Sequence, residues 1–505
     1  MFLPPILLFS FSILITIIIL KLFGHKYAMD LPDIRKQHVG KIPQIGGIVF
    51  GPVLLFIAWC LDLAPHWYII GGSVSILLGT IDDNYHVPWK IKFIIQLTLA
   101  AYLSMIFWGR FEVISFFNLS FSFSQILVLV VFLFWFIGIY NAVNLLDGLD
   151  GLAGGFMFLI CMGMSISGDN DFAKLNFILA MILLGFLIFN QRPAKLFMGD
   201  AGSLFLGFHV SVLPLLFIDN NQSLNLLNST PFIFIASFLV ADTTRVFFTR
   251  ILNKKNPMTA DTIHFHHLVI QNTGSHLSSI GTIYLLTVIS VIFSVLSFTY
   301  QLSNNFMIGY LALLLIFILT PPIQTYVPII TRTIGPLYKW QNNLKDERFF
   351  IPRTLFVITL FVGLIISIYF NSILFFNWHH LISVITITIS ILFYRKDKMA
   401  IYFIQLMLVL LFSEMYWSIE LGTISKIFTI LLIVTFLTFM LEKRYGCSIN
   451  QFSSLDLLVI FIIITGIIFS RLLIGFSSWY FLTIFALWFG TSFIALRTLF
   501  LIKEV

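Results

Sequence analysis

Between Gln125 and Tyr140 the chain reads Gln-Ile-Leu-Val-Leu-Val-Val-Phe-Leu-Phe-Trp-Phe-Ile-Gly-Ile-Tyr, and Asn141-Ala-Val-Asn144-Leu-Leu-Asp147-Gly-Leu-Asp150-Gly follows directly. The first run has no charge and is long enough for most of a membrane crossing. The two aspartates therefore lie where hydrocarbon gives way to headgroups, a costly place for carboxylates. We expect chemistry there, at a site open to a lipid and to a water-soluble substrate.

The composition is that of a membrane protein. Hydrophobic residues make up 59% and charged residues 10% of the 505 residues, whereas a soluble domain is about half apolar and about a quarter charged. Apolar runs of roughly 15 to 22 residues recur along the chain, and no window alternates like a barrel strand. We predict an all-α, polytopic helical integral membrane protein with about 16 or 17 transmembrane helices.

Basic residues give the predicted orientation. The first apolar run, residues 3–22, has no basic segment before it and no cleavage site after it, which indicates a retained anchor. Lys and Arg follow it, so the positive-inside rule places the N-terminus outside and the first loop in the cytoplasm. Alternating crossings put nearly all other Lys and Arg in the cytoplasm, with the exceptions Arg110, Lys174, Lys426 and Arg471.

The chain divides at a basic stretch. Residues 1–330 hold about eleven predicted spans, with polar clusters in their cytoplasmic loops. Residues 331–353 read as a basic cytoplasmic linker, and residues 354–505 as an additional membrane domain of about six spans whose role the residues do not indicate. The three cysteines show no metal or disulfide spacing.

Five polar clusters fall on the predicted cytoplasmic face. In the first, Arg35 and Lys36 stand beside a turn and a glycine pair. They are suited to hold an anionic ligand, although a positive-inside loop looks much the same.

The second cluster is Asp82-Asp83 at the end of an apolar run, with Lys90 and Lys92 shortly after it. Adjacent carboxylates repel each other unless a cation or a proton relieves them. The pair therefore indicates a nearby divalent metal or a base that activates phosphate, and a solvated turn is the alternative.

The third cluster is the opening motif. On a helix, Asn144, Asp147 and Asp150 would share one face, and an amide with two carboxylates suits oxygen ligation of Mg²⁺. In the fourth cluster, Asp200 stands between glycines as the next span begins, where it is either a helix cap or a metal ligand.

The fifth cluster combines the basic residues Arg245 and Arg250 with His264, His266 and His267. Such histidines bind a metal or contact phosphates, and zinc is disfavoured because no partner completes a tetrahedral set. Acids for a hard cation and basic groups for phosphates on one face together indicate a diphosphate substrate. No Gly-x-x-x-x-Gly-Lys-Ser/Thr loop is present, so ATP hydrolysis is not indicated.

These segments, in this order, resemble the polyprenyl-phosphate N-acetylhexosamine-1-phosphate transferase family (glycosyltransferase family 4), and in particular its WecA-type branch. The resemblance covers residues 1–330 and rests on Asp82-Asp83, Asn144-Leu-Leu-Asp147-Gly-Leu-Asp150-Gly, Phe197-Met-Gly-Asp200-Ala-Gly-Ser203 and His264-Phe-His266-His267. The last motif is similar to the His-x-His-His form of the GlcNAc-type enzymes, which argues against a peptidoglycan precursor as the substrate.

The resemblance implies a reaction. Undecaprenyl phosphate attacks the β-phosphorus of a UDP-N-acetyl sugar in the bacterial inner membrane, as the first membrane step of O-antigen or other cell-surface polysaccharide synthesis. Direct attack by the lipid phosphate is the simpler hypothesis, and a covalent intermediate on an aspartate is the alternative. UDP-GlcNAc is the default donor, and UDP-GalNAc, UDP-FucNAc and UDP-QuiNAc are the alternatives. The implied partners are the lipid, the UDP-sugar and the bilayer, without nucleic acid, and homodimers are common among relatives.

The resemblance also implies residue roles. Asn144 and Asp200 match Mg²⁺ ligands, with Mn²⁺ as a substitute. The matched catalytic positions are Asp82 and Asp83, for the lipid phosphate, and Asp147 and Asp150, near nucleotide and metal. The matched substrate-binding residues are Lys90, Arg250, His264, His266 and His267. Arg35 and Lys36 are further candidates from the first polar cluster, independent of the resemblance.

Two features depart from the family pattern. Thr262 stands where Arg or Lys usually precedes the histidine motif, which puts substrate contacts there in doubt, and residues 354–505 extend beyond the usual family member. A lipid-linked sugar flippase is an alternative, which predicts charges along a path through the bilayer. A degenerate member serving as a scaffold is another, against which the intact acidic motifs argue.

Overall fold

The computed structural model describes residues 5–24, 28–30, 41–110, 113–116, 119–166, 170–220, 226–254, 263–273, 276–299 and 307–312, with residues 314 and 458. The chain divides into two compact units, Ile15–Pro328 and a second made of Met1–Leu14 with Ile329–Val505. The predicted linker, residues 331–353, and the predicted additional membrane domain, residues 354–505, lie outside the described residues apart from Leu458.

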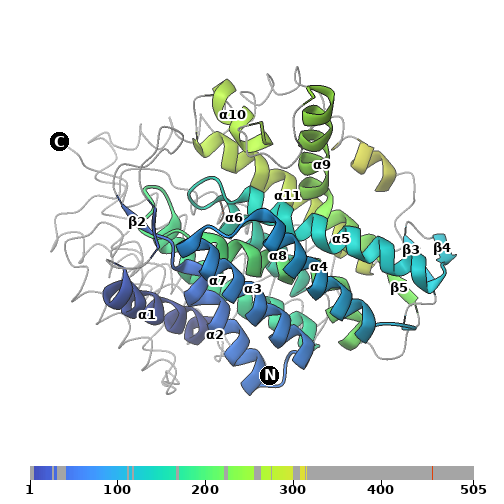
Figure 1. The fold of residues 1–505 in the computed structure, drawn as a ribbon, viewed down its shortest axis with the longest axis horizontal. Coiled ribbons are helices and arrows are strands. Elements are labelled where there is room, and N and C mark those ends of the chain that lie inside the picture. The colour runs from blue at the N-terminus through green and yellow to red at the C-terminus, as the bar shows by residue number, and fades with distance from the viewer. Residues whose placement is uncertain are drawn as a thin grey trace, which may run out of the picture. The chain divides into compact units, whose positions relative to one another are not determined.

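The described chain is mainly helical (Figure 1). The helices are α1 (Pro5–Phe23), α2 (Gly46–Cys60), α3 (His66–Tyr85), α4 (Trp89–Ile106), α5 (Gln125–Leu146), α6 (Leu152–Met164), α7 (Asp171–Asn190), α8 (Gly199–Asn220), α9 (Thr230–Leu252), α10 (Phe265–Thr273) and α11 (His276–Thr299). The strands are β1 (Met29–Asp30), β2 (Ile42–Pro43), β3 (Val113–Phe116), β4 (Leu119–Ser122) and β5 (Leu226–Asn228). β1 pairs with β2, and β3 pairs antiparallel with β4 and parallel with β5.

Six of the described helices are long and apolar enough to cross a membrane, namely α4, α5, α7, α8, α9 and α11. Shorter apolar helices occur in α1, α2 and α6. The predicted class, an all-α polytopic membrane protein, is confirmed, and the strands are short connections between helices. The total of about 16 or 17 spans and the orientation stay predictions.

Helix α8 lies at the centre of this unit, in contact with α2, α3 and α5 (Figure 1). Of its apolar window 94% is buried, as in α7, against 28% in α4 and 33% in α5. The exposed apolar faces of α4 and α5 suit contact with lipid tails. The chain thus places α8 in the protein interior and α4 and α5 at its edge.

Glycines allow the neighbours of α8 to approach its first turns. A Cβ added at Gly47 would lie 2.0 Å from the backbone nitrogen of Gly202, and one at Gly79 would lie 2.3 Å from the Cα of Ala201. Small residues at such contacts let the backbones of membrane helices pack closely. The position of the α8 N-terminus therefore depends on the absence of side chains on α2 and α3.

Two of the predicted exceptions to the positive-inside rule carry ion pairs. Arg110 lies 2.9 Å from Asp219, and Lys174 lies 3.0 Å from Asp171. These aspartates offset the positive charges locally. Lys426 and Arg471 lie outside the described residues.

The substitution Gly79→Ala should destabilise the protein by about 3 kcal/mol, because the new methyl group meets backbone atoms of α8 that cannot move aside. Gly138→Ala, on the open side of α5, is the matched control, since a Cβ there has no atom within 4 Å. Thermal unfolding in detergent measures both. An unchanged Tm for Gly79→Ala would contradict the close approach of α3 and α8.

Candidate active site

A side chain from another helix caps the N-terminus of α8. Asp83, near the end of α3, accepts hydrogen bonds from the backbone N–H of Asp200 at 2.7 Å and of Ala201 at 3.1 Å. The first N–H groups of a helix have no partner within it and favour an anion. Gly199 takes a φ of +69°, and a Cβ there would lie 2.6 Å from Asp83 Oδ2. Asp83 therefore fixes the backbone that presents Asp200.

The two predicted Mg²⁺ ligands line one cleft, Asp200 from α8 and Asn144 from the last turn of α5. Ser203 joins their helices, because its Oγ donates a hydrogen bond to Asn144 Oδ1 at 2.6 Å. Asp83 supplies the cap of α8, and the Asp200 side chain lines the cleft, so its role as a metal ligand stays a prediction. Sequence reasoning misses Ser203, although its spacing of three residues from Asp200 on a helix is a usable signal.

The acidic motif forms a turn. Helix α5 ends at Leu146 and α6 begins at Leu152, so the prediction that Asn144, Asp147 and Asp150 share a helical face is wrong. The turn is held from outside: Ala194 N–H donates to Asp150 Oδ2 at 3.1 Å, and Gly151 N–H donates to Asn190 Oδ1 at 3.0 Å. Gly151 has a φ of +81°, a conformation that glycine adopts without strain.

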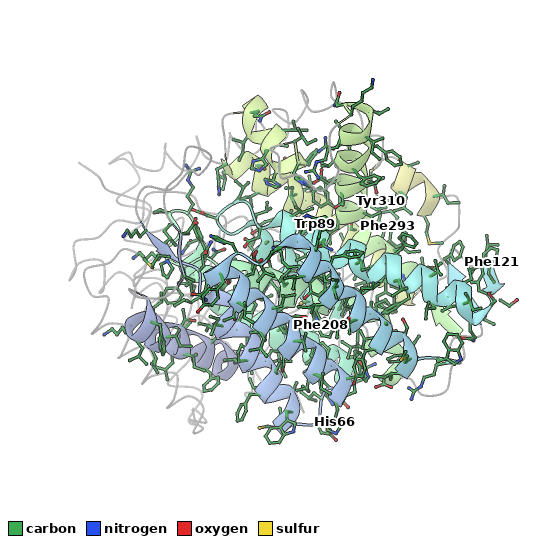
Figure 2. All side chains as sticks on the ribbon, viewed as in Figure 1. His66, Trp89, Phe121, Phe208, Phe293 and Tyr310 are labelled. Carbon is green, nitrogen blue, oxygen red and sulfur yellow. The ribbon has the colours of Figure 1, made fainter. Side chains whose placement is uncertain are left out.

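Lys92 connects two of the acidic clusters. Its Nζ lies 2.5 Å from Asp82 Oδ2 and 4.0 Å from Asp200 Oδ2. Lys90, the lysine matched by the resemblance, is exposed and lies 6.0 Å from the ring of Trp89. Trp89, the first residue of α4, is labelled in Figure 2. Lys90 and Lys92 both follow the acid pair in the sequence. Because α4 begins at Trp89, the rotation of this helix places Lys92, and not Lys90, beside Asp82.

The histidine motif meets the acidic turn. A Cβ added at Gly148 would lie 2.6 Å from His266 Nε2, so the imidazole packs against the turn. The ring of His267 lies 4.1 Å from that of His266, and His267 lines the cleft. His264 is buried, with its Nδ1 3.0 Å from Asp242 Oδ2. Sequence reasoning misses Asp242, although a carboxylate inside an apolar span is a recognised signal.

The remaining predicted binding residues are Arg250, Arg35 and Lys36. Arg250 is buried in the last turn of α9 and is not among the described lining residues of the cleft. Arg35 and Lys36, like Thr262, lie outside the described residues.

The cleft has a volume of about 460 Å³. Its described lining consists of Asp30, Gln44, Asn144, Asp147, Gly148, Leu149, Asp150, Asn190, Arg192, Phe197, Gly199, Asp200, His267 and His276. Four of these side chains are carboxylic acids, and in this described lining Arg192 is the one group that is always cationic. Sequence reasoning misses Arg192 and His276 as lining residues.

The carboxylates disfavour one another's charge. Burial, followed by the charges of Asp83 and Asp150, raises the pKa of Asp147 to about 7. Burial, and then the charge of Arg192, lowers the pKa of His276 to about 4, so this histidine is neutral at pH 7. With four carboxylic acids and one guanidinium, the described lining of the cleft holds more acidic than basic groups, although Asp147 is about half neutral at pH 7.

The donor set fits a hard cation that binds together with a phosphate ligand. Mg²⁺ takes oxygen ligands and is usually bound through one or two carboxylates plus substrate phosphates. Asn144 and Asp200 supply an amide oxygen and a carboxylate to the same cleft, and the excess of acidic groups favours a cation there. Among the described residues, no group of three or more His, Cys, Asp or Glu side chains is arranged to hold a metal by itself.

The chain is similar to known proteins over this region. The model of glycosyl transferase family 4 matches residues 66–218, which run from α3 into α8. A probable undecaprenyl-phosphate N-acetylglucosaminyl 1-phosphate transferase of Bacillus subtilis (strain 168) is 35% identical over 305 residues, which cover 58% of this chain and 81% of that protein.

Two undecaprenyl-phosphate alpha-N-acetylglucosaminyl 1-phosphate transferases are also similar. The protein of Thermotoga maritima is 27% identical over 301 residues, covering 59% of this chain and 91% of its own length. The protein of Escherichia coli (strain K12) is 29% identical over 260 residues, covering 48% of this chain and 69% of its own length.

The substitution Gly148→Ala should reduce the activity of the site by about 10-fold or more, because its methyl group displaces the His266 imidazole from the acidic turn. Stability should change little, since the turn lies at the cleft surface. Gly138→Ala again serves as the control. Equal turnover in Gly148→Ala and Gly138→Ala would show that activity does not depend on the contact between His266 and Gly148.

The stability of the metal-free protein should depend on Asp147. Because its pKa is raised from 3.8 to about 7, this carboxyl contributes stability that is present below pH 4 and is lost as the pH rises through 7. Asp147→Asn should therefore raise the Tm by a few degrees at pH 8 and leave it nearly unchanged at pH 4. Tm values across this pH range, for example by scanning fluorimetry, measure the difference. A gain that is largest at low pH would contradict the raised pKa.

Proposed function

Because the chain belongs to glycosyl transferase family 4, we propose that it transfers an N-acetylhexosamine 1-phosphate group from a UDP-N-acetyl sugar to undecaprenyl phosphate. The products are the undecaprenyl-diphospho-sugar and UMP. The observation that carries the proposal is the single cleft in which Asn144, Asp147, Asp150 and Asp200 meet His267. The relatives' names state an undecaprenyl phosphate acceptor and a GlcNAc 1-phosphate group.

The proposed chemistry is one substitution at phosphorus. A phosphate oxygen of the lipid attacks the β-phosphorus of the donor. A new P–O bond forms, the bond from the β-phosphorus to the bridging oxygen breaks, and UMP leaves with that oxygen and its electron pair. In phosphoryl transfer, positioning and neutralisation of the phosphate charge account for most of the catalysis.

The metal is part of this proposal. Mg²⁺, or Mn²⁺ in its place, would be held by Asn144 and Asp200 and would neutralise charge on the diphosphate oxygens. Asp147 and Asp150 orient the nucleotide diphosphate from the turn beside these ligands. His267, which lines the same cleft from α10, contacts the diphosphate.

The acceptor end of the site is assigned to the Asp82–Lys92 pair. Lys92 offers a cation to the lipid phosphate, and Asp82 holds that cation in place at 2.5 Å. The outer face of α4 is largely exposed and apolar, which suits a polyprenyl tail beside this pair. Asp83 supports the reaction indirectly, since both of its oxygens hold the backbone at Asp200 and Ala201.

The finer assignments follow from the same proposal. UDP-GlcNAc is the default donor, and UDP-GalNAc, UDP-FucNAc or UDP-QuiNAc differ from it only in groups that local pocket contacts read. The site lies on the cytoplasmic face of a bacterial inner membrane, and UDP-sugars occur in the cytoplasm. The reaction starts the synthesis of a cell-surface polysaccharide such as an O-antigen. Release of UMP from each of the four donors ranks them directly.

Purified protein with Mg²⁺, undecaprenyl phosphate and UDP-GlcNAc should release UMP, and Asp200→Asn should reduce this release by about 100-fold or more. The matched control is Asp219→Asn, at the other end of α8. The Asp219 carboxylate forms an ion pair with Arg110, and Asp219 is not among the described lining residues of the cleft. A flippase would release no UMP from any donor in the panel. Equal rates for Asp200→Asn and the wild type would remove Asp200 from the reaction.

A further inference from the structure

Helix α9 carries a buried carboxylate that has no part in the chemistry proposed above. Asp242 is 6% exposed and lies in the middle of a helix that is long and apolar enough to cross a membrane. An ionised side chain at such a position is costly and usually has a specific partner and a functional reason. Its partners in the fold therefore indicate what it does.

Both carboxylate oxygens of Asp242 are engaged. Oδ2 lies 3.0 Å from His264 Nδ1, and Oδ1 accepts hydrogen bonds from Arg245 at 2.8 Å and from the backbone N–H of Phe265 at 3.0 Å. Arg245 in turn donates to the carbonyl oxygen of Ile263. One acid and one guanidinium on α9 thus hold three consecutive residues, Ile263 to Phe265.

These contacts anchor the start of α10. Phe265 is the first residue of this helix, so its N–H is one of the donors without a partner inside the helix, and a carboxylate there is favourable. With nine residues, α10 is too short to be stable alone. Its position depends on such anchors, which also include the hydrogen bond from Ser279 Oγ to the His266 carbonyl at 3.0 Å.

The anchored turn leads directly to the cleft. The rings of His264 and His266 stack with centroids 6.0 Å apart and planes at 11°, and His266 packs against Gly148 of the acidic turn. His267, the next residue, lines the cleft. A movement of His264 would therefore be passed to the two histidines that contact the turn and the cleft.

Asp242 also selects the proton position on His264. Because the ionised carboxylate can only accept, Nδ1 carries the hydrogen and Nε2 is the other ring nitrogen. The Nε2 atoms of His264 and His266 are buried and have no hydrogen-bond partner within the described residues. A carboxylate that orients an imidazole in this way acts through the histidine and not on the substrate.

We propose that Asp242 is a positioning residue, which holds the His264–His267 segment against the acidic turn and so sets the affinity of the cleft for the UDP-sugar. This inference rests on the proposed transferase function. The arrangement at α10 is the same as that at α8, where Asp83 caps the helix on which Asp200 lies. In both cases an aspartate from another helix fixes the first turn of a helix that lines the cleft.

The test compares Asp242→Asn, His264→Gln and the double variant in the UMP-release assay. In Asp242→Asn the amide oxygen still accepts from Phe265 N–H, but the amide NH2 that faces His264 can only donate, so Nδ1–H of His264 loses its acceptor and the tautomer is no longer held. We expect the KM for UDP-GlcNAc to rise by about 10- to 100-fold in each single variant, with the KM for undecaprenyl phosphate changed by less than about 2-fold. The double variant should be no worse than the worse single variant, because the two residues act as one unit. Asp219→Asn, which also loses an ion pair, should keep the wild-type KM.

Three results would overturn the proposal. One is a loss of kcat alone, in proportion to the folded fraction, which a merely structural role predicts. Another is an additive loss in the double variant. The third is an unchanged KM in Asp242→Asn while the wild type is active. A wild type that releases no UMP would instead reject the proposed function itself.

A second variant keeps the test decisive if Asp242→Asn alone does not fold. Removing the acid leaves Arg245 as an uncompensated buried charge, which is destabilising. Asp242→Asn combined with Arg245→Gln removes both charges and should fold, with the same rise in the KM for UDP-GlcNAc. A folded double variant with the wild-type KM would reject the positioning role.

Discussion

The first turn of α8 has to be held in place before Asp200 can serve in any site. Gly47 and Gly79 allow the backbones of α2 and α3 to pack directly against the backbone of this turn. Asp83 accepts hydrogen bonds from two of its N–H groups. A side chain at either glycine would move α8, and with it Ser203 and its bond to the end of α5. The cleft is thus a consequence of how closely membrane helices pack around one helix terminus.

Electrostatics explains why such close packing serves a phosphate substrate. The described lining of the cleft gathers four carboxylic acids and one guanidinium, and burial, followed by the charges of Asp83 and Asp150, raises the pKa of Asp147 to about 7. The fold therefore keeps several acids close together, an unfavourable arrangement of charge that a cation would relieve. Under the proposed function, a diphosphate that enters with Mg²⁺ would complete the charge balance, so binding of the metal and binding of the donor would be coupled.

The sequence predicts the class of the fold and five of the residues that line the cleft. Apolar runs define the spans, and Asn144, Asp147, Asp150 and Asp200, though far apart in the chain, do line one cleft. The sequence does not predict the end of α5 at Leu146, because the turn that follows is held by a contact with Asn190 at the end of α7. The choice of Lys92 over Lys90 depends on the rotation of α4. The capping roles of Asp83 and Asp242 depend on tertiary neighbours that no local pattern contains.

The most direct measurement of this account is an experimental structure of the protein with Mg²⁺ and UDP-GlcNAc. The account predicts the metal between Asn144 and Asp200, bound also by diphosphate oxygens, with Asp147 and Asp150 beside the nucleotide and His267 on the diphosphate. A metal held by Asp82 and Asp83 alone, or a nucleotide bound outside the cleft, would contradict it.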